Sequence, residues 1–479
     1  MNYRNILYTL GWVLNIEAAC LALPAICAVC YGEIFYLKYI AITIGLSLLF
    51  GIALTCRAPE NKAMYAKEGF VTVALSWITM SIFGSLPFFL SGAIPNFADA
   101  IFETVSGFST TGATILTDIE ALPKSLIFWR SFTHWIGGMG VLVFLVALLP
   151  LSGGGNLHLM RAESTGPAVS KIVPKVKSSA KIIYLIYIAI TVVEIVLLLL
   201  GGLDLFSALT LSFGTMGTGG FTILNSGAAD YSSYVQIVIT VFMFLCGIDF
   251  SLYYLILIGK FKDAIKSEEM RSYVAMVAFA IVAITVNING LFENVWTALK
   301  HAAFQVASVV TTTGYATVDF NLWPEFSKAV LVALMLVGAC AGSTGGGIKV
   351  SRVLILIKSI IKEIRVAAHP KTTVKVSLNG KTVESETVRA VNVYIGTFMV
   401  ITVVSVLLIS LENFNFTTNL TAVIATLNNI GPGLDVVGPM GNFSVFSSAS
   451  KLLFSLLMLI GRLEVFPMLM LFSYRTWKK

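Results

Sequence analysis

The sequence predicts an all-α polytopic membrane protein in which four membrane–pore-loop–membrane repeats surround a central pseudo-fourfold pore, after two extra N-terminal transmembrane helices. Three observations support this fold class. Hydrophobic residues make up 57% of the 479-residue chain and charged residues only 12%, whereas about a quarter of a soluble domain is charged. The mean hydropathy is +0.87. Long apolar stretches also recur along the chain, and shorter ones between them are followed by glycine-containing loops.

Ten apolar stretches approach or exceed the roughly 20 residues that a membrane-spanning helix needs; they cover residues 6–30, 37–56, 70–92, 126–150, 181–201, 235–259, 273–290, 327–348, 389–411 and 447–473. The first is too long for the core of a signal peptide, so we expect a retained helix. Four further stretches are too short to cross a bilayer and are expected to be re-entrant helices: 97–108, 204–215, 295–310 and 416–427.

The positions of the charges predict the topology. The chain has a net charge of +7. If the spans alternate from a cytoplasmic N-terminus, the cytoplasmic segments contain 25 of the 32 lysines and arginines, and the outer segments are acidic. This distribution follows the positive-inside rule. We therefore expect a multi-pass protein of the cytoplasmic (inner) membrane with both termini cytoplasmic, whose basic loops face lipid headgroups and not nucleic acid.

Composition also argues against an enzyme. The six cysteines are too few for a disulfide scaffold. Cys27 and Cys30 form a C-x-x-C without partner ligands, which indicates packing more than zinc. No nucleotide-binding or hydrolase motif occurs in a fitting context. We expect no cofactor bound to this chain.

The loops after the four short stretches align on one glycine each, namely Gly112, Gly220, Gly314 and Gly431. Non-helical backbone persists at membrane depth only when it is buried in protein or lines a water-filled cavity. Rings of backbone carbonyls can replace the hydration shell of a cation, and the negative ends of the preceding helices favour one. The pattern therefore predicts a carbonyl-lined cation pore.

The predicted ion-binding residues are four from each loop: Thr110, Thr111, Gly112, Ala113, Thr218, Gly219, Gly220, Phe221, Thr312, Thr313, Gly314, Tyr315, Asn429, Ile430, Gly431 and Pro432. The predicted organisation is two N-terminal helices in 1–69, then repeats in 70–180, 181–272, 273–388 and 389–479, with pore loops at 109–114, 217–222, 311–316 and 428–433.

Four motifs resemble those of the Trk/Ktr/HKT superfamily of potassium transporters: S-G-F-S-T-T-G-A-T (106–114), R-S-F-T-H-W-I-G-G-M-G (130–140), A-G-S-T-G-G-G-I-K (341–349) and N-N-I-G-P-G (428–433). The two extra N-terminal spans resemble the Trk pore-forming subunit. This resemblance implies potassium uptake, since all four filter positions are glycine. It also implies a homodimer and a cytosolic regulatory subunit of the RCK/TrkA type, which would bind the nucleotide (ATP/ADP or NAD/NADH). Because the four loops differ from one another, we expect weaker discrimination between ions than in a dedicated potassium channel.

A glycine-rich segment, 338–348, interrupts the eighth apolar stretch and is a poor helix former. The resemblance implies that it is an intramembrane gating loop, formed chiefly by Gly342, Ser343, Thr344, Gly345, Gly346 and Gly347. Arg462 lies in the middle of the last apolar stretch, where a cation must face protein or water. Our hypothesis is that Arg462 meets this loop and opposes cation passage; the alternative is a structural ion pair with Glu464 or another buried acid.

Two other functions remain open from the sequence. A proton- or sodium-coupled potassium symporter would use an intramembrane acid, and Glu17, Glu194 and Asp249 are the candidates, although helix–helix hydrogen bonds explain them as well. A membrane-embedded enzyme or sensor would need a cluster of catalytic groups, which the sequence does not contain. We interpret His134 as a packing residue and not as a metal ligand.

Overall fold

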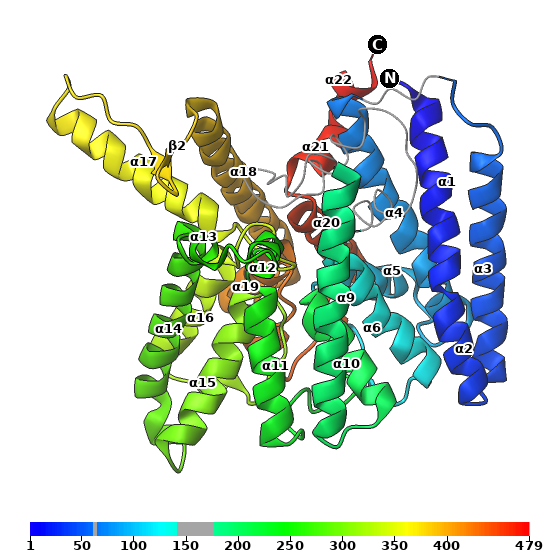
Figure 1. Ribbon diagram of the computed structural model, residues 1–479. Helices are drawn as coiled ribbons and strands as arrows, with labels where there is room; N and C mark the ends of the chain where they lie inside the picture. The colour runs from blue at the N-terminus through cyan, green and yellow to red at the C-terminus, as the bar shows by residue number, and fades with distance from the viewer. Residues whose placement is uncertain (61–64, 141–175, 479) are drawn as a thin grey trace.

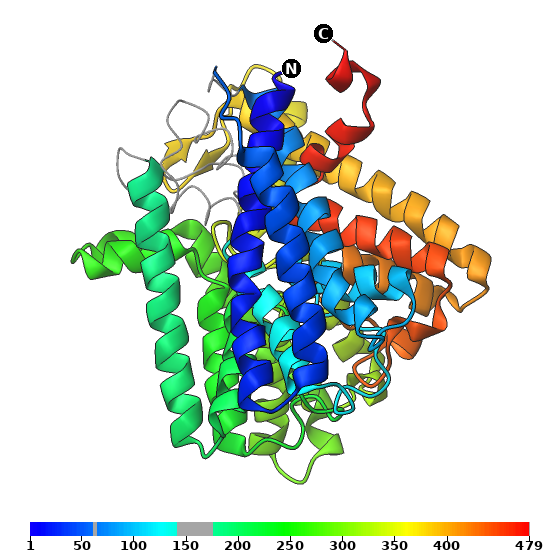
Figure 2. The same ribbon diagram turned by 90° about the vertical axis from the view of Figure 1, so that its right-hand side faces the viewer.

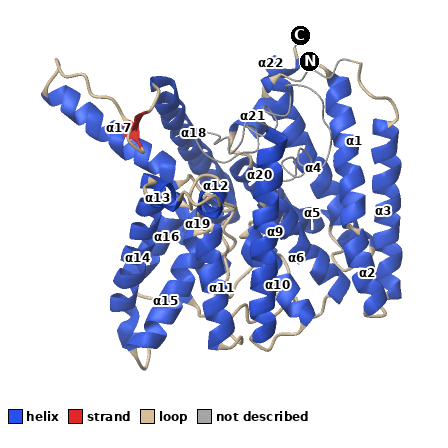
Figure 3. Cartoon of the chain, viewed as in Figure 1, coloured by secondary structure: helices blue, strands red, loops and turns tan. Residues whose placement is uncertain are grey.

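The computed structural model describes residues 1–60, 65–140 and 176–478, and this part of the chain is almost entirely helical (Figures 1 and 3). Its one pair of strands, β1 (Ser377–Leu378) and β2 (Lys381–Thr382), forms an antiparallel hairpin. Both termini lie at the same end of the molecule (Figure 2), where the Tyr3 hydroxyl donates a 3.5 Å hydrogen bond to the Trp477 carbonyl. The predicted all-α fold class is confirmed.

Two antiparallel spans precede the repeated part of the chain. The first consists of α1 (Tyr3–Cys20) and α2 (Ala22–Cys30), and the second is α3 (Ile34–Thr55). Glycines allow α1 and α3 to approach closely, because a Cβ atom added to Gly11 would lie 2.8 Å from the Gly51 carbonyl oxygen. Small residues at helix contacts are typical of membrane proteins, in which close backbone packing stabilises helix association.

The same order of elements then occurs four times: a long apolar helix, a short helix that ends in the interior, a loop, and a second helix. The four sets are α4 (Ala66–Leu90), α5 (Phe97–Phe108) and α6 (Lys124–Gly138); α9 (Val176–Leu200), α10 (Leu205–Gly217), α11 (Ser233–Cys246) and α12 (Phe250–Leu257); α14 (Glu268–Ile288), α15 (Val295–Val310), α16 (Glu325–Val337) and α17 (Val350–Ala368); and α18 (Ser385–Ile409), α19 (Phe416–Leu427), α20 (Ser448–Arg462) and α21 (Phe466–Phe472). Shorter elements connect them: α13 (Phe261–Ile265), α22 (Tyr474–Trp477), and the 3-10 turns η1 (Asn289–Leu291), η2 (Phe320–Leu322), η3 (Ser410–Glu412), η4 (Asp435–Val437) and η5 (Phe443–Val445).

Each short interior helix begins at an asparagine or aspartate that caps it. The side chains of Asn96, Asp204, Asn294 and Asn415 accept hydrogen bonds from backbone amides in the first turn of α5, α10, α15 and α19. Such N-caps satisfy amides that lack partners within the helix. The cap fixes where each short helix begins, and therefore how far its C-terminal end reaches into the molecule.

The prediction of ten candidate spans was wrong in part, although the interruption predicted at 338–348 is present. Among the described residues, six helices are long and apolar enough to cross a membrane, or seven if the bent pair α11 and α12 is one span. The axes of α11 and α12 differ by 92°, α16 stops at Gly338, and α20 stops before Glu464 and Val465. Gly338, Glu464 and Val465 have positive φ angles of 76°, 57° and 69°, respectively, which a helix cannot accommodate. Part of the fourth stretch, 126–150, lies outside the described residues.

Neighbouring units share their hydrophobic cores and close into a ring. Buried residues of α5 and α20 belong to one core cluster, in which the rings of Phe102 and Phe443 lie 5.5 Å apart. A second cluster joins α14–α16 to α19, and a third joins α10 and α11 to α15. Since these cores cross every junction between units, the repeat boundaries predicted from the sequence stay predictions.

Candidate filter and gate

The four loops that follow the interior helices have the same backbone conformation. Two positions in each loop have positive φ angles: Thr110 and Gly112, Thr218 and Gly220, Thr312 and Gly314, and Asn429 and Gly431. The residue between each pair is not in this region. An alternation of handedness turns successive peptide carbonyls toward the same side of the chain, and a non-glycine residue adopts positive φ only when its surroundings enforce it.

The loops contact one another in a closed order around the interior. A Cβ atom added to Gly112 would overlap the carbonyl oxygen of Gly219, and one on Gly220 would overlap that of Thr313. A Cβ on Gly314 would overlap the Ile430 oxygen. Finally, one on Gly431 would lie 2.8 Å from the Thr111 oxygen. Each aligned glycine therefore faces the carbonyl that precedes the aligned glycine of the next loop, and only glycine leaves room for this arrangement.

Most carbonyl oxygens of the predicted ion-binding residues are available to an ion. In the part of the chain that the structure describes, none of those in the first three positions of each loop accepts a hydrogen bond (Thr110 to Gly112, Thr218 to Gly220, Thr312 to Gly314 and Asn429 to Gly431). Buried backbone carbonyls normally have a partner. This concentration of buried carbonyls without partners is what a site for a dehydrated cation requires.

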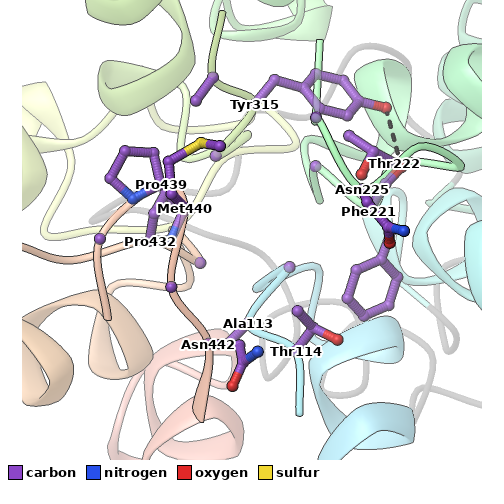
Figure 4. Close-up of a pocket in the computed structure, with 18 of the residues that line it drawn as sticks. Ala113, Thr114, Phe221, Thr222, Asn225, Tyr315, Pro432, Pro439, Met440 and Asn442 are labelled. Atoms are coloured by element: carbon purple, nitrogen blue, oxygen red, sulfur yellow. Dashed lines mark hydrogen bonds between the residues drawn. The ribbon is translucent and has the colours of Figure 1, made fainter. Parts of the chain in front are cut away.

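The fourth predicted position is less uniform. The Phe221 carbonyl accepts a 3.3 Å hydrogen bond from the Tyr315 hydroxyl, and the Tyr315 carbonyl accepts one of 2.6 Å from Ser308. These two oxygens are already engaged by the protein, in contrast to the three preceding positions in each loop. Together with Ala113 and Pro432 they border an outer cavity of about 370 Å³ (Figure 4).

The glycine-rich loop between α16 and α17 lies against the candidate filter loops on the side away from this cavity. The Gly346 amide donates a 2.7 Å hydrogen bond to the Thr312 hydroxyl. A Cβ on Gly345 would lie 2.9 Å from the Thr311 carbonyl oxygen, and one on Gly346 would lie 3.1 Å from the Asn429 Cβ. The predicted gating loop is therefore in direct contact with the third and fourth filter loops. Within it, the Ser343 hydroxyl donates to the Cys340 carbonyl, and Gly342 and Gly347 have positive φ angles.

Arg462 holds this loop from the side of α20. Its side chain is buried, with 7% of the residue exposed. Its guanidinium donates to the Thr344 carbonyl at 2.8 Å and to the carbonyls of Gly137 and Gly138 at 2.5 and 2.8 Å. The loop and α6 therefore meet at one cation. Glu464, the alternative partner considered from the sequence, instead pairs with Arg352 on α17.

Sequence reasoning missed a second buried cation at the predicted gating loop. Lys349 is 1% exposed and donates from Nζ to the Gly345 carbonyl. Its φ angle of 84° turns the chain into α17. The Arg352–Glu464 ion pair, which links α17 to the break after α20, was also missed. The available signal was a lysine two residues after a glycine run in apolar surroundings, where an isolated charge is costly.

The intramembrane acids are not part of the four candidate filter loops. Asp249 caps α12 through the Ser251 amide at 2.8 Å, and the neighbouring Phe250 amide donates to the Gly342 carbonyl at 3.1 Å. Glu17 and Glu194 are buried. His134 lies on α6 with Nδ1 2.8 Å from the Gly107 carbonyl. Among the described residues, no group of histidine, cysteine, aspartate and glutamate side chains is arranged to hold a metal ion.

Comparison with known proteins agrees with this architecture. The family model described as "TrkH: Cation transport protein" matches residues 37–277 and 272–478. The chain is 33% identical to the Trk system potassium uptake protein TrkH of Salmonella typhimurium and 32% identical to that of Escherichia coli K12, in both cases over 100% of each chain. The crystal structure of the potassium transporter TrkH from Vibrio parahaemolyticus superimposes with a TM-score of 0.89 at 28% identity, again over 100% of each chain. The chain belongs to the TrkH family of cation transport proteins.

Proposed function

We propose that this protein is the pore-forming subunit of a potassium uptake system of the cytoplasmic membrane. The observation that carries the proposal is the ring formed by the four loops, in which each aligned glycine faces a carbonyl of the next loop. Potassium would lose its hydration water and be coordinated by these oxygens, to which no donor of the described residues is hydrogen-bonded. The relatives named as potassium uptake proteins support potassium as the ion.

The surroundings of the ring favour a cation without supplying an acidic ligand. The C-terminal ends of α5, α10, α15 and α19 immediately precede the four filter loops, and helix C-termini bear partial negative charge. On the outer side, Asp319 lines the cavity that leads to the ring. A carboxylate at such a mouth raises the local cation concentration without binding the ion tightly.

Passage would be controlled below the filter. The loop from Gly342 to Gly347 touches Thr312, and Arg462 and Lys349 bond its carbonyls. Two buried cations next to the pathway oppose entry of a third, because Coulomb repulsion is strong where water is excluded. Opening therefore requires the loop to move away from the filter. Arg462 and Lys349 must either move with the loop or release its carbonyls.

Regulation and orientation complete the proposal. The basic cytoplasmic loops at 151–181, 259–272 and 349–390 would dock a cytosolic regulatory subunit of the RCK/TrkA type, which would bind the nucleotide. Most of the first loop lies outside the described residues. In Figure 1, α17 and the β hairpin extend toward the end of the molecule where both termini lie, consistent with a common cytoplasmic side. We also propose a homodimer, as the family resemblance implies, and a transport role without catalysis.

Uptake of ⁸⁶Rb⁺ into proteoliposomes containing the purified chain tests this proposal. External potassium should compete with the tracer at much lower concentration than sodium does. Equal competition by both ions would refute a potassium-selective filter. Empty liposomes processed in parallel give the background leak.

A coupled symporter is the second candidate, and the buried Glu194 is the observation that favours it. Both of its carboxylate oxygens are buried without a hydrogen bond of standard geometry. A buried acid of this kind often takes up and releases a proton during transport. At fixed voltage, a dependence of uptake on the proton gradient that Glu194→Gln abolishes would favour coupling; uptake independent of that gradient would favour a simple pore.

A further inference from the structure

The exit of the first filter loop is held by a buried glutamate. Glu103 on α5 is 1% exposed and stands nine residues before Gly112. Its carboxylate accepts hydrogen bonds of 2.9 and 3.1 Å from the Thr114 hydroxyl and of 3.0 Å from the Ile115 amide. The corresponding residues of the other interior helices are not acidic: Leu211, Gln305 and Ala422. The contact therefore exists in one repeat only.

Arg130 extends this contact to the second loop. Its Nε donates to Glu103 at 2.6 Å, and its Nη1 donates to the Thr222 carbonyl at 3.1 Å. The guanidinium carbon lies only 3.4 Å from the centre of the Phe221 ring. Arg130 is 2% exposed, yet it borders the outer cavity. One planar cation from the first repeat therefore fixes both the backbone and the side chain at the exit of the second loop.

The same exit is held from its other side by the third repeat. The Tyr315 hydroxyl donates to the Phe221 carbonyl at 3.3 Å, which the dashed line in Figure 4 marks, and to the Leu211 carbonyl at 3.2 Å. Phe221 follows Gly220 directly, so a shift of its peptide group changes the direction of the glycine carbonyl. Residues of the first and third repeats therefore hold the second loop in place. Its two adjacent glycines would otherwise make the loop intrinsically flexible.

We propose that Glu103 and Arg130 are positioning residues that set the ion selectivity of the filter through the second loop. The inference rests on the proposed function and adds to it a determinant outside the filter loops. The charge of the pair is balanced, so it adds no net field at the outer cavity. What it contributes is geometry: Arg130 presents donors in a rigid plane that also stacks on an aromatic ring, which lysine cannot reproduce.

The experiment measures the permeability ratio of potassium to sodium from reversal potentials of the purified chain in planar bilayers. Arg130→Lys keeps the charge opposite Glu103 but removes the stacked plane, and the ratio should fall about tenfold, the effect of losing one charge-assisted hydrogen bond. Tyr315→Phe removes only the hydroxyl that holds Phe221 and should lower the ratio about threefold, as expected for a neutral bond.

Lys451→Met is the matched control. It breaks the 2.8 Å ion pair between Lys451 on α20 and Asp99. Asp99 lies on α5, one turn before Glu103, but its ion pair is with α20, whereas Glu103 bonds a filter loop. Its ratio should equal that of the wild type, and monodispersity and thermal unfolding are measured for every variant. Should Arg130→Lys not fold, Glu103→Gln takes its place: it keeps the size of the side chain but removes the ion pair that holds Arg130, and an unchanged ratio in that variant would overturn the inference.

The outcomes separate the two proposals. A wild-type chain that passes potassium and sodium equally would refute the proposed function itself. A selective wild type with unchanged ratios in both folded variants would overturn the inference. An equal fall in the Lys451→Met control would overturn it too, because the effect would then be general destabilisation.

Discussion

Replacing Arg462 with alanine tests the gate most sharply, because this side chain connects a movable loop to a fixed helix. The guanidinium bonds the Thr344 carbonyl at 2.8 Å on the loop and the carbonyls of Gly137 and Gly138 on α6. Only the first of these bonds distinguishes a loop resting against the filter from a loop that has moved away. The alanine variant therefore weakens the closed arrangement specifically.

The size of the effect follows from that one bond. A hydrogen bond to a charged group contributes about 1.5–3 kcal/mol, and about 1.4 kcal/mol corresponds to a tenfold change in an equilibrium constant. The equilibrium between closed and open loop should then shift about 10- to 100-fold toward the open form. Removal of the positive charge lowers the barrier to a cation as well, so both changes increase flux.

The assay is initial uptake of ⁸⁶Rb⁺ into proteoliposomes, with equal amounts of monodisperse wild type and variant. We expect a rise of at least tenfold for Arg462→Ala, following the lower bound above. Arg462→Lys, which keeps a cation but has fewer donors, should give an intermediate rate. Unchanged flux in a folded alanine variant would refute the barrier role assigned to this residue.

Three further predictions concern the filter, the gate and the outer loops. Gly220→Ala should lower selectivity for potassium over sodium in competition assays, because the added Cβ would overlap the Thr313 carbonyl oxygen and the φ angle of this residue is 75°. Gly45→Ala is the control and should leave selectivity unchanged, since a Cβ added there would have no atom within 4 Å. Lys349→Met should raise ⁸⁶Rb⁺ flux by releasing the Gly345 carbonyl, whereas Lys362→Met, whose ion pair is with the adjacent Glu363, should leave it unchanged. Hydrogen bonds from Thr418 and then Asn415 lower the pKa of Asp435. The ionised carboxylate therefore stabilises the fold above its unfolded pKa of about 3.9, and this stabilisation is lost as the pH falls through the folded pKa. As the pH is lowered from 6 to 3, the melting temperature should fall less steeply for Asp435→Asn than for the wild type, and identical slopes would contradict this assignment.

The four glycine-containing loops could be located from the sequence because their signals are local. A short apolar segment, a glycine at a fixed distance and a following span are all readable from residue order, and the four glycines indeed face carbonyls of neighbouring loops. The caps at Asn96, Asp204, Asn294 and Asn415 were readable too, as asparagine or aspartate before an apolar helix, but they were not used.

What the sequence could not provide depends on contacts between distant segments. Arg130 is separated from Thr222 by 92 positions, and Arg352 from Glu464 by 112. No local pattern identifies such partners. The breaks after α11 and within the last stretch after α20 were missed as helix ends, because hydropathy measures how apolar a segment is and not whether its backbone remains helical.

The most direct test of the carbonyl filter is an anomalous difference map from crystals of this protein soaked in rubidium. The account predicts peaks on the axis enclosed by the carbonyl oxygens of Thr111, Gly219, Thr313 and Ile430, where the four loops face one another. Sodium added in excess should not remove them. An axis without a peak, or rubidium bound instead beside Glu194 or Asp249, would contradict the account.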